Sequence, residues 1–189
     1  MNSNRKNATI AGALILFAYA VLASDVIDSK IVAMISEALS GLAVIGIAVI
    51  MFPLFKPYNK NASFWYLFLR IIEGVLMVIA GILFLSHNTL LLDIRDEIYI
   101  WHAYIFAVAA LFFYYLLYVS NIIPRWLSVW GFIASLFLII VNVLEGLNIV
   151  SENIILYLPI ISNEVVLAIW LMVKGFNLFD TNKEIRKSV

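Results

Sequence analysis

Charged and polar side chains that interrupt long apolar stretches are the residues of this sequence that could do chemistry. Arg70 and Glu73 are three residues apart, a spacing that places two side chains on one face of a helix. Glu164 follows Asn163 in a second apolar stretch, and Glu37 stands in a third. An ionised group inside hydrocarbon costs on the order of 3 kcal/mol or more, so it has to be paired, neutralised or hydrated. We therefore treat these residues as a candidate binding site.

Counting residues from the ends of the apolar stretches gives the expected depth of each group. At about 1.5 Å of rise per residue, Arg70 is expected about 10 Å from one membrane surface, and Glu73 and Glu164 near the midplane. Glu37 is expected about 10 Å below the opposite surface. Three further polar residues are expected nearer that surface, namely His102, Asn142 and Glu145.

The expected deep charges do not balance. Three carboxylates, Glu37, Glu73 and Glu164, face a single deep cation, Arg70. Two negative charges then have to be removed by protonation, by a bound cation or by water. Perturbed carboxylates are typical of functional sites, and chains of them form the proton relays of membrane proteins. This pattern predicts a site that binds or moves a proton, a cation or a small polar solute.

The same residues allow two other interpretations. In the first, Arg70 pairs with Glu73 or Glu164, and the protein is a non-catalytic scaffold or regulator. Asn163 would then add a hydrogen bond between helices. In the second, a polar cavity with His102 or a carboxylate acts on a lipid-like substrate. No nucleophile, phosphate-binding or dinucleotide motif occurs in the sequence, which favours a non-enzymatic protein without deciding the point.

Metal ions and cofactors are not expected. The chain has no cysteine and two histidines, and it lacks the His–His and Glu–His spacings that are typical of zinc sites. His102 with Glu37, Glu73 and Glu145 would make a carboxylate-rich site with a single histidine, a poor match to catalytic zinc. Lys174 lies close to the end of its apolar stretch. A lysine there is expected to extend to the membrane surface rather than to hold a retinal.

Six apolar stretches position these residues, and most reach the ~20 residues that a helix needs to cross a ~30 Å hydrocarbon core. The chain of 189 residues is 65% hydrophobic and 13% charged, unlike a soluble domain. We predict an all-α fold, a polytopic transmembrane six-helix bundle that forms one domain over residues 1–189. The expected helices cover residues 8–24, 31–52, 62–86, 98–119, 124–147 and 153–176, with a loop over 87–98 and a tail over 177–189.

Basic residues are distributed unequally between the two sides of the predicted bundle. Nine lie on the side of the termini, and only Lys30 and Arg95 lie on the opposite side. Under the positive-inside rule, both termini and the tail are then cytoplasmic. Aromatic residues mark the expected membrane surface on the same side, among them Trp65 and Tyr66. The nine basic residues are Arg5, Lys6, Lys56, Lys60, Arg125, Lys174, Lys183, Arg186 and Lys187.

The first apolar stretch has a second interpretation. Arg5 and Lys6, the apolar run over residues 10–23 and the small residues near its end are also typical of a cleavable signal peptide. We favour a retained helix because it accounts for the charges of the other loops.

Composition also indicates which binding partners to expect. The chain carries 12 basic and 12 acidic residues, and its zero net charge gives no reason to expect nucleic acid. Membrane lipids are the expected surroundings, and a homo-oligomer or another membrane partner stays open. A chain without cysteine does not reveal its redox compartment.

Two segments near the C-terminus resemble a known family. They read IPRWLSVWG over residues 123–131 and NEVVLAIWLMVKGF over residues 163–176. With the helix layout, Arg70 in the third helix and His102 at the outer end of the fourth, they resemble the prokaryotic membrane-protein family called domain of unknown function 4386. The resemblance implies a bacterial or archaeal inner membrane and a first helix that is kept. It brings no established activity.

Overall fold

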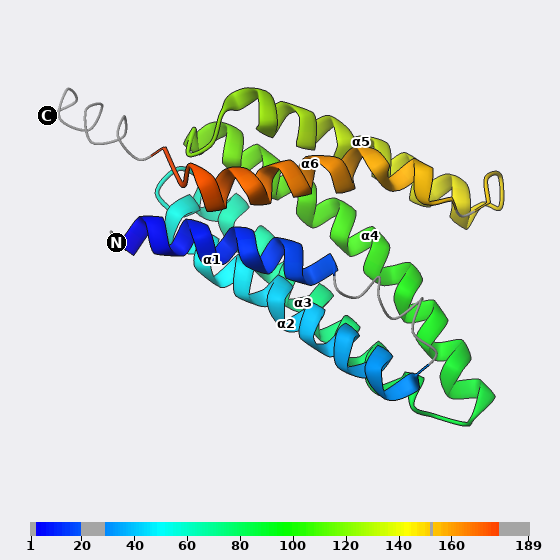
Figure 1. Ribbon diagram of the computed structural model, residues 1–189. Helices are drawn as coiled ribbons and strands as arrows, with labels where there is room; N and C mark the ends of the chain where they lie inside the picture. Colours follow the sequence, from blue (N-terminus) through cyan, green and yellow to red (C-terminus); the bar gives the residue numbers. More distant parts are fainter. Residues whose placement is uncertain (1–2, 20–28, 152, 178–189) are drawn as a thin grey trace, which may run out of the picture.

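The computed structural model describes residues 3–19, 29–151 and 153–177. Within these ranges the chain forms six helices and no strand (Figure 1), which confirms the all-α prediction. The helices are α1 (Ser3–Ala18), α2 (Lys30–Phe55), α3 (Lys60–Phe84), α4 (Thr89–Ser120), α5 (Arg125–Gly146) and α6 (Ile154–Val173).

The described helices suit a bilayer better than water. Helices α2 to α6 are 20 to 32 residues long and are apolar enough to cross a membrane, whereas α1 has 16 residues. Large apolar side chains cover their outer faces, and Leu42, Ile82 and Ile133 are 58 to 60% exposed. Such a surface would be unstable in water and is solvated by lipid. The chain is therefore a multi-pass integral membrane protein.

The helix boundaries differ from expectation chiefly at α4. A loop was expected over residues 87–98, but α4 already begins at Thr89. Asn88 caps this helix because its side chain accepts a hydrogen bond from the backbone N–H of Leu90 at 3.0 Å. The loop prediction is wrong because the charges between Asp93 and Glu97 were taken as a sign of irregular structure. A helix can carry such charges where it leaves the hydrocarbon.

The other boundaries shift by smaller amounts. Helix α1 begins at Ser3 rather than at residue 8, and α2 continues through Pro53 to Phe55. Residues 20–24 of the first expected helix lie outside the described residues. The expected tail lies outside them as well, apart from Asn177.

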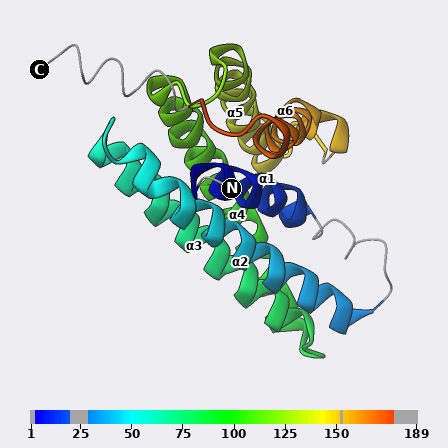
Figure 2. The ribbon, with the colours of Figure 1, turned by 60° about the vertical axis from the view of Figure 1, so that its left-hand side comes forward.

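The six described helices close a ring. Each helix packs against its neighbours in the chain, and α6 packs against α1. Figure 2 shows α2 and α3 on one side and α5 and α6 on the other, with α1 and α4 between them. Arg5 joins the two ends of the ring because its Nη2 donates hydrogen bonds to the carbonyl oxygens of Met172, at 3.3 Å, and Val173, at 2.6 Å. Carbonyls in the last turn of a helix lack partners within that helix.

Glycines let neighbouring helices approach closely. Where α2 crosses α3, a Cβ added to Gly41 would collide with the carbonyl oxygen of Gly74, and a Cβ added to Gly74 would collide with that of Gly41. Where α1 crosses α6, a Cβ added to Gly12 would collide with the carbonyl oxygen of Ala168. Close backbone contact of this kind is a main source of helix association in lipid.

Replacing Gly41 or Gly74 by alanine is expected to lower the free energy of unfolding by about 1–3 kcal/mol, because α2 and α3 must separate to admit the methyl group. Gly46→Ala is the matched control, since a Cβ there would meet only the end of the Leu14 side chain. Thermal unfolding of the purified protein in detergent measures the three changes. An equal loss for all three variants would contradict the close contact.

Candidate functional site

Polar side chains from opposite helices meet inside the ring. Arg70 and Glu73 of α3 and Glu164 of α6 are 6%, 1% and 8% exposed. Two helices separate α3 from α6 in either direction around the ring, yet Arg70 and Glu164 interact electrostatically. Their side chains therefore face each other across the interior. The residues that interact there, here called the interior cluster, are Tyr19, Tyr66, Arg70, Glu73, His102, Tyr114 and Glu164.

Arg70 is the cation at the centre of the interior cluster. Its Nη1 lies 3.0 Å from both carboxylate oxygens of Glu73, one turn further along α3. Its guanidinium carbon also lies 5.1 Å from the ring centre of Phe106 and 5.8 Å from that of Tyr66. Aromatic faces attract cations, so the guanidinium is held by a carboxylate and by two rings. Of the two partners left open by the sequence, Glu73 forms the direct ion pair.

Glu164 has a different environment from Glu73. Its Oε2 accepts a hydrogen bond from the hydroxyl group of Tyr19 at 2.8 Å. It forms no ion pair with a Lys, Arg or His side chain among the described residues. The buried hydroxyl group of Tyr114, which interacts with Glu164, has no hydrogen-bond partner in the part of the chain that the structure describes. Glu164 is therefore the carboxylate of the interior cluster with the least direct compensation.

His102 of α4 connects the interior cluster to the outer part of the ring. Its Nε2 lies 3.8 Å from Oε1 of Glu73, and 21% of its side chain is exposed. The ring of Tyr99 lies beside it, with 5.9 Å between ring centroids. His102 was expected at the outer end of its helix, but α4 already begins at Thr89, so His102 lies well inside the helix and within reach of a deep carboxylate.

Glu37 forms a separate ion pair outside the interior cluster. Its Oε1 accepts a hydrogen bond from Nη2 of Arg95 at 2.9 Å, and Glu37 is fully buried. The guanidinium carbon of Arg95 also lies 4.4 Å from the ring centre of Phe84 and 4.7 Å from that of Tyr99. The other oxygen of Glu37 has no hydrogen-bond partner among the described residues.

This pair corrects the charge balance expected from the sequence. Arg95 was placed in a loop outside the bilayer, but the early start of α4 puts it on a helix that faces Glu37. Three buried carboxylates, Glu37, Glu73 and Glu164, therefore face two arginines rather than one. The excess of negative charge is one, not two, and it falls on Glu164.

Two of the expected site residues hold helices together instead of joining the cluster. Nδ2 of Asn163 donates a hydrogen bond to the carbonyl oxygen of Leu127 at 3.1 Å, which ties α6 to α5. Glu145 of α5 accepts a hydrogen bond from the hydroxyl group of Tyr157 of α6 at 2.5 Å. Hydrogen bonds between membrane helices contribute about 0.6–2 kcal/mol each.

Sequence reasoning missed the tyrosines of the interior cluster. Tyr66 was assigned to the membrane surface, but it is fully buried beside Arg70. The signal was its spacing of four residues from Arg70, which places both on one face of α3. No comparable signal connects Tyr19 to Glu164, because 145 residues separate them.

Comparison with known proteins gives one match. The profile of the family described as Domain of unknown function (DUF4386) matches residues 10–175. The chain belongs to this family, as the two C-terminal segments indicated, and the match includes every residue of the interior cluster. No curated protein and no solved structure matches the chain.

Removing one partner of the Arg70–Glu73 pair is expected to destabilise the protein strongly. Arg70→Ala leaves a buried carboxylate without its cation, and such a loss typically lowers the free energy of unfolding by about 3–5 kcal/mol. The double variant Arg70→Met with Glu73→Leu should recover much of this loss, because it removes both charges of the pair. Unfolding in detergent measures both variants.

The matched control is Arg125→Ala, which removes an exposed arginine from the first turn of α5. It is expected to leave the unfolding transition nearly unchanged. A double variant that is as unstable as the sum of its two single variants would show that the pair is not a coupled unit.

Proposed function

We propose that this member of the DUF4386 family binds and moves a proton through the interior cluster. The observation that carries the proposal is Glu164, a buried carboxylate in a membrane-spanning helix with a tyrosine hydroxyl group as its direct partner. Burial favours the neutral form of a carboxyl group, whereas a nearby cation and a hydroxyl donor favour the ionised form. Glu164 is subject to both influences, since Arg70 and Tyr19 lie close to it. A group that exchanges protons needs this competition.

The other groups of the interior cluster suit a proton path. Glu73 and His102 are 3.8 Å apart, and His102 is partly exposed. The hydroxyl groups of Tyr66 and Tyr114 are near enough to Glu164 for an electrostatic interaction, but neither has a hydrogen-bond partner among the described residues. Chains of Asp, Glu and His side chains conduct protons in membrane pumps and transporters. A proton suits this cluster because Glu73 and His102 lie 3.8 Å apart and Tyr19 donates a hydrogen bond to Glu164, although a small cation would use the same carboxylates.

A second candidate function is a non-catalytic scaffold or regulator. The ion pairs Arg70–Glu73 and Glu37–Arg95 favour it, because buried charge pairs also serve to specify how helices pack. In that case the protonation of Glu164 has no role in function. The proton function predicts that Glu164→Gln changes proton flux, whereas the scaffold function predicts that it changes only stability.

Glu164→Gln is expected to abolish proton movement while the protein stays folded. The amide keeps the shape of the side chain and its hydrogen bond from Tyr19 but cannot carry a proton, so the flux should fall by at least about tenfold. The measurement uses protein reconstituted into liposomes that contain a pH-sensitive dye, with a potassium diffusion potential as the driving force. Glu97→Gln is the control, because Glu97 is exposed and lies outside the interior cluster.

Wild-type liposomes without proton flux, or equal flux through wild type and Glu164→Gln, would overturn the proton proposal. Equal flux together with a loss of stability in Glu164→Gln would favour the scaffold. Tyr19→Phe is a second test of the proton proposal. It removes the hydrogen-bond donor to Glu164 and should slow the proton flux without abolishing it.

We further propose that all six helices cross an inner membrane, with both termini in the cytoplasm. The support is that two connections and two ends that carry basic residues lie together. Asn177 donates a backbone hydrogen bond to Ile122, Arg5 reaches the end of α6, and Asn59 donates to the hydroxyl group of Tyr115. Helix α1 also packs against α2 and α6, which supports a first helix that is kept. The basic residues at this end are Arg5, Lys6, Lys56, Lys60, Arg125 and Lys174.

The absence of cysteine makes this topology testable with single introduced thiols. A membrane-impermeant maleimide should label Ser151→Cys in intact cells, because residue 151 lies in the connection opposite the termini. Asn4→Cys and Asn177→Cys should react only after the cells are permeabilised. Opposite accessibility of residues 4 and 177 would contradict an even number of crossings, and the reverse pattern for all three would contradict the orientation.

A further inference from the structure

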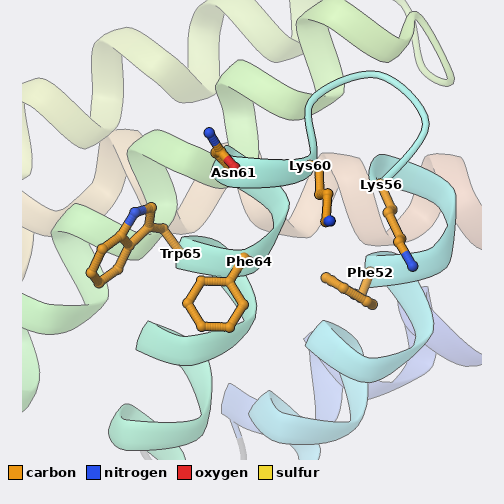
Figure 3. A pocket seen from close by; sticks show the side chains of 6 residues that line it. All are labelled: Phe52, Lys56, Lys60, Asn61, Phe64 and Trp65. Atoms are coloured by element: carbon orange, nitrogen blue, oxygen red, sulfur yellow. The ribbon is translucent and has the colours of Figure 1, made fainter.

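A hollow of about 390 Å³ lies where α2 connects to α3, away from the interior cluster (Figure 3). It combines positive charge, an amide and aromatic rings at one place on the outer surface of the ring. No acidic side chain is among the residues that line it. These residues are Phe52, Lys56, Lys60, Asn61, Phe64 and Trp65.

Two lysines converge on this hollow. Lys56 follows the last residue of α2, and Lys60 is the first residue of α3. Figure 3 shows both side chains on the same side of the connection, directed toward Phe52. Nζ of Lys56 lies 5.9 Å from the ring centre of Phe52. Neither lysine forms an ion pair with a carboxylate of the described residues. Two positive charges therefore line one hollow without an ion-pair partner among the described residues.

The connection that carries the lysines is held in place by hydrogen bonds. The side chain of Asn59 accepts a hydrogen bond from the backbone N–H of Ala62 at 3.0 Å, which caps α3. Its Nδ2 donates to the hydroxyl group of Tyr115 of α4 at 3.3 Å, and Ser63 donates to the Asn59 carbonyl oxygen at 2.6 Å. The lysines consequently emerge from fixed backbone positions, which lowers the entropic cost of binding an anion between them.

The aromatic side of the hollow continues onto the lipid-facing surface of α3. Phe64, Trp65 and Phe68 are 54%, 49% and 44% exposed. Phe64 and Phe68 stack at 6.2 Å between ring centroids, and Trp65 meets Phe68 edge to face at 5.8 Å. Tryptophan prefers the level of the lipid head groups, so the hollow lies at that level. An occupant that matches both sides has an anionic head and an apolar tail.

We propose that this hollow binds an anionic phospholipid, with the phosphate group between Lys56 and Lys60 and the upper part of the acyl chains against Phe64 and Trp65. A free phosphate ion would satisfy the lysines and leave the aromatic surface unused, which is why the lipid is the better match. The N-terminus of α3, at Lys60 and Asn61, adds backbone N–H groups that favour an anion at the same place. The lipid site does not depend on proton movement through the interior cluster.

Native mass spectrometry of the protein in nanodiscs tests the lipid site. The lipid mixture is phosphatidylcholine with a minor share of phosphatidylglycerol, and the bound lipids that survive release from the nanodisc are counted. Wild type is expected to retain phosphatidylglycerol in preference to phosphatidylcholine. Lys56→Gln with Lys60→Gln should weaken this retention by about 30-fold, since a lysine placed beside an anionic head group contributes about a factor of five to its binding.

The matched control is Lys6→Gln with Lys174→Gln, which removes the same charge from exposed lysines at the same end of the ring. It should retain phosphatidylglycerol as wild type does. An equal loss in both double variants, or no preference in wild type, would overturn the site. Competition by millimolar inorganic phosphate or by soluble glycerol phosphate would also overturn it, because the head group alone would then suffice. Thermal unfolding confirms that each variant is folded.

Discussion

Charge inside a ring of apolar helices is the constraint on which this structure depends. A carboxylate in such an interior needs a cation, a hydrogen-bond donor or a proton. The protein meets this need in three ways: Glu73 pairs with an arginine of its own helix, Glu37 with an arginine of α4, and Glu164 with a tyrosine hydroxyl group. Because the last two partners come from other elements, satisfying the charges also holds the helices in register.

The interior and the outer surface of the ring carry different kinds of side chain. Buried ionisable groups gather where α3, α4 and α6 face the centre, and apolar side chains face outward. The hollow beside Lys56 and Lys60 is an exception on the outer side, at the level where hydrocarbon gives way to head groups. A single layer of helices thus separates two kinds of polar site, one shielded from lipid and one open to it.

Much of this arrangement can be predicted from the sequence. The contacts that could not be predicted are those that depend on how distant helices are placed. Hydropathy and helical spacing are local, so they indicate the helices, the burial of Glu164 and an ion pair of Arg70 with either Glu73 or Glu164. The position of Arg95 was missed because a charged segment at a helix end looks like a loop until Glu37 is known to face it. The Tyr19–Glu164 contact depends on ring closure, which no local pattern encodes.

The ring is closed by a contact between α1 and α6, the first and the last of the six helices in the chain, and this affects how the bundle assembles during synthesis. Of the six helices, α1 leaves the ribosome first and α6 last. Tyr19 therefore cannot donate its hydrogen bond to Glu164, 145 residues further along the chain, until α6 has been synthesised. Arg70 and Glu73 pair as soon as α3 forms, because they lie on one helix. Until α6 arrives, the nascent bundle is open on one side, and its polar interior faces lipid or the insertion machinery. The last helix is the one that shields the charges of the others.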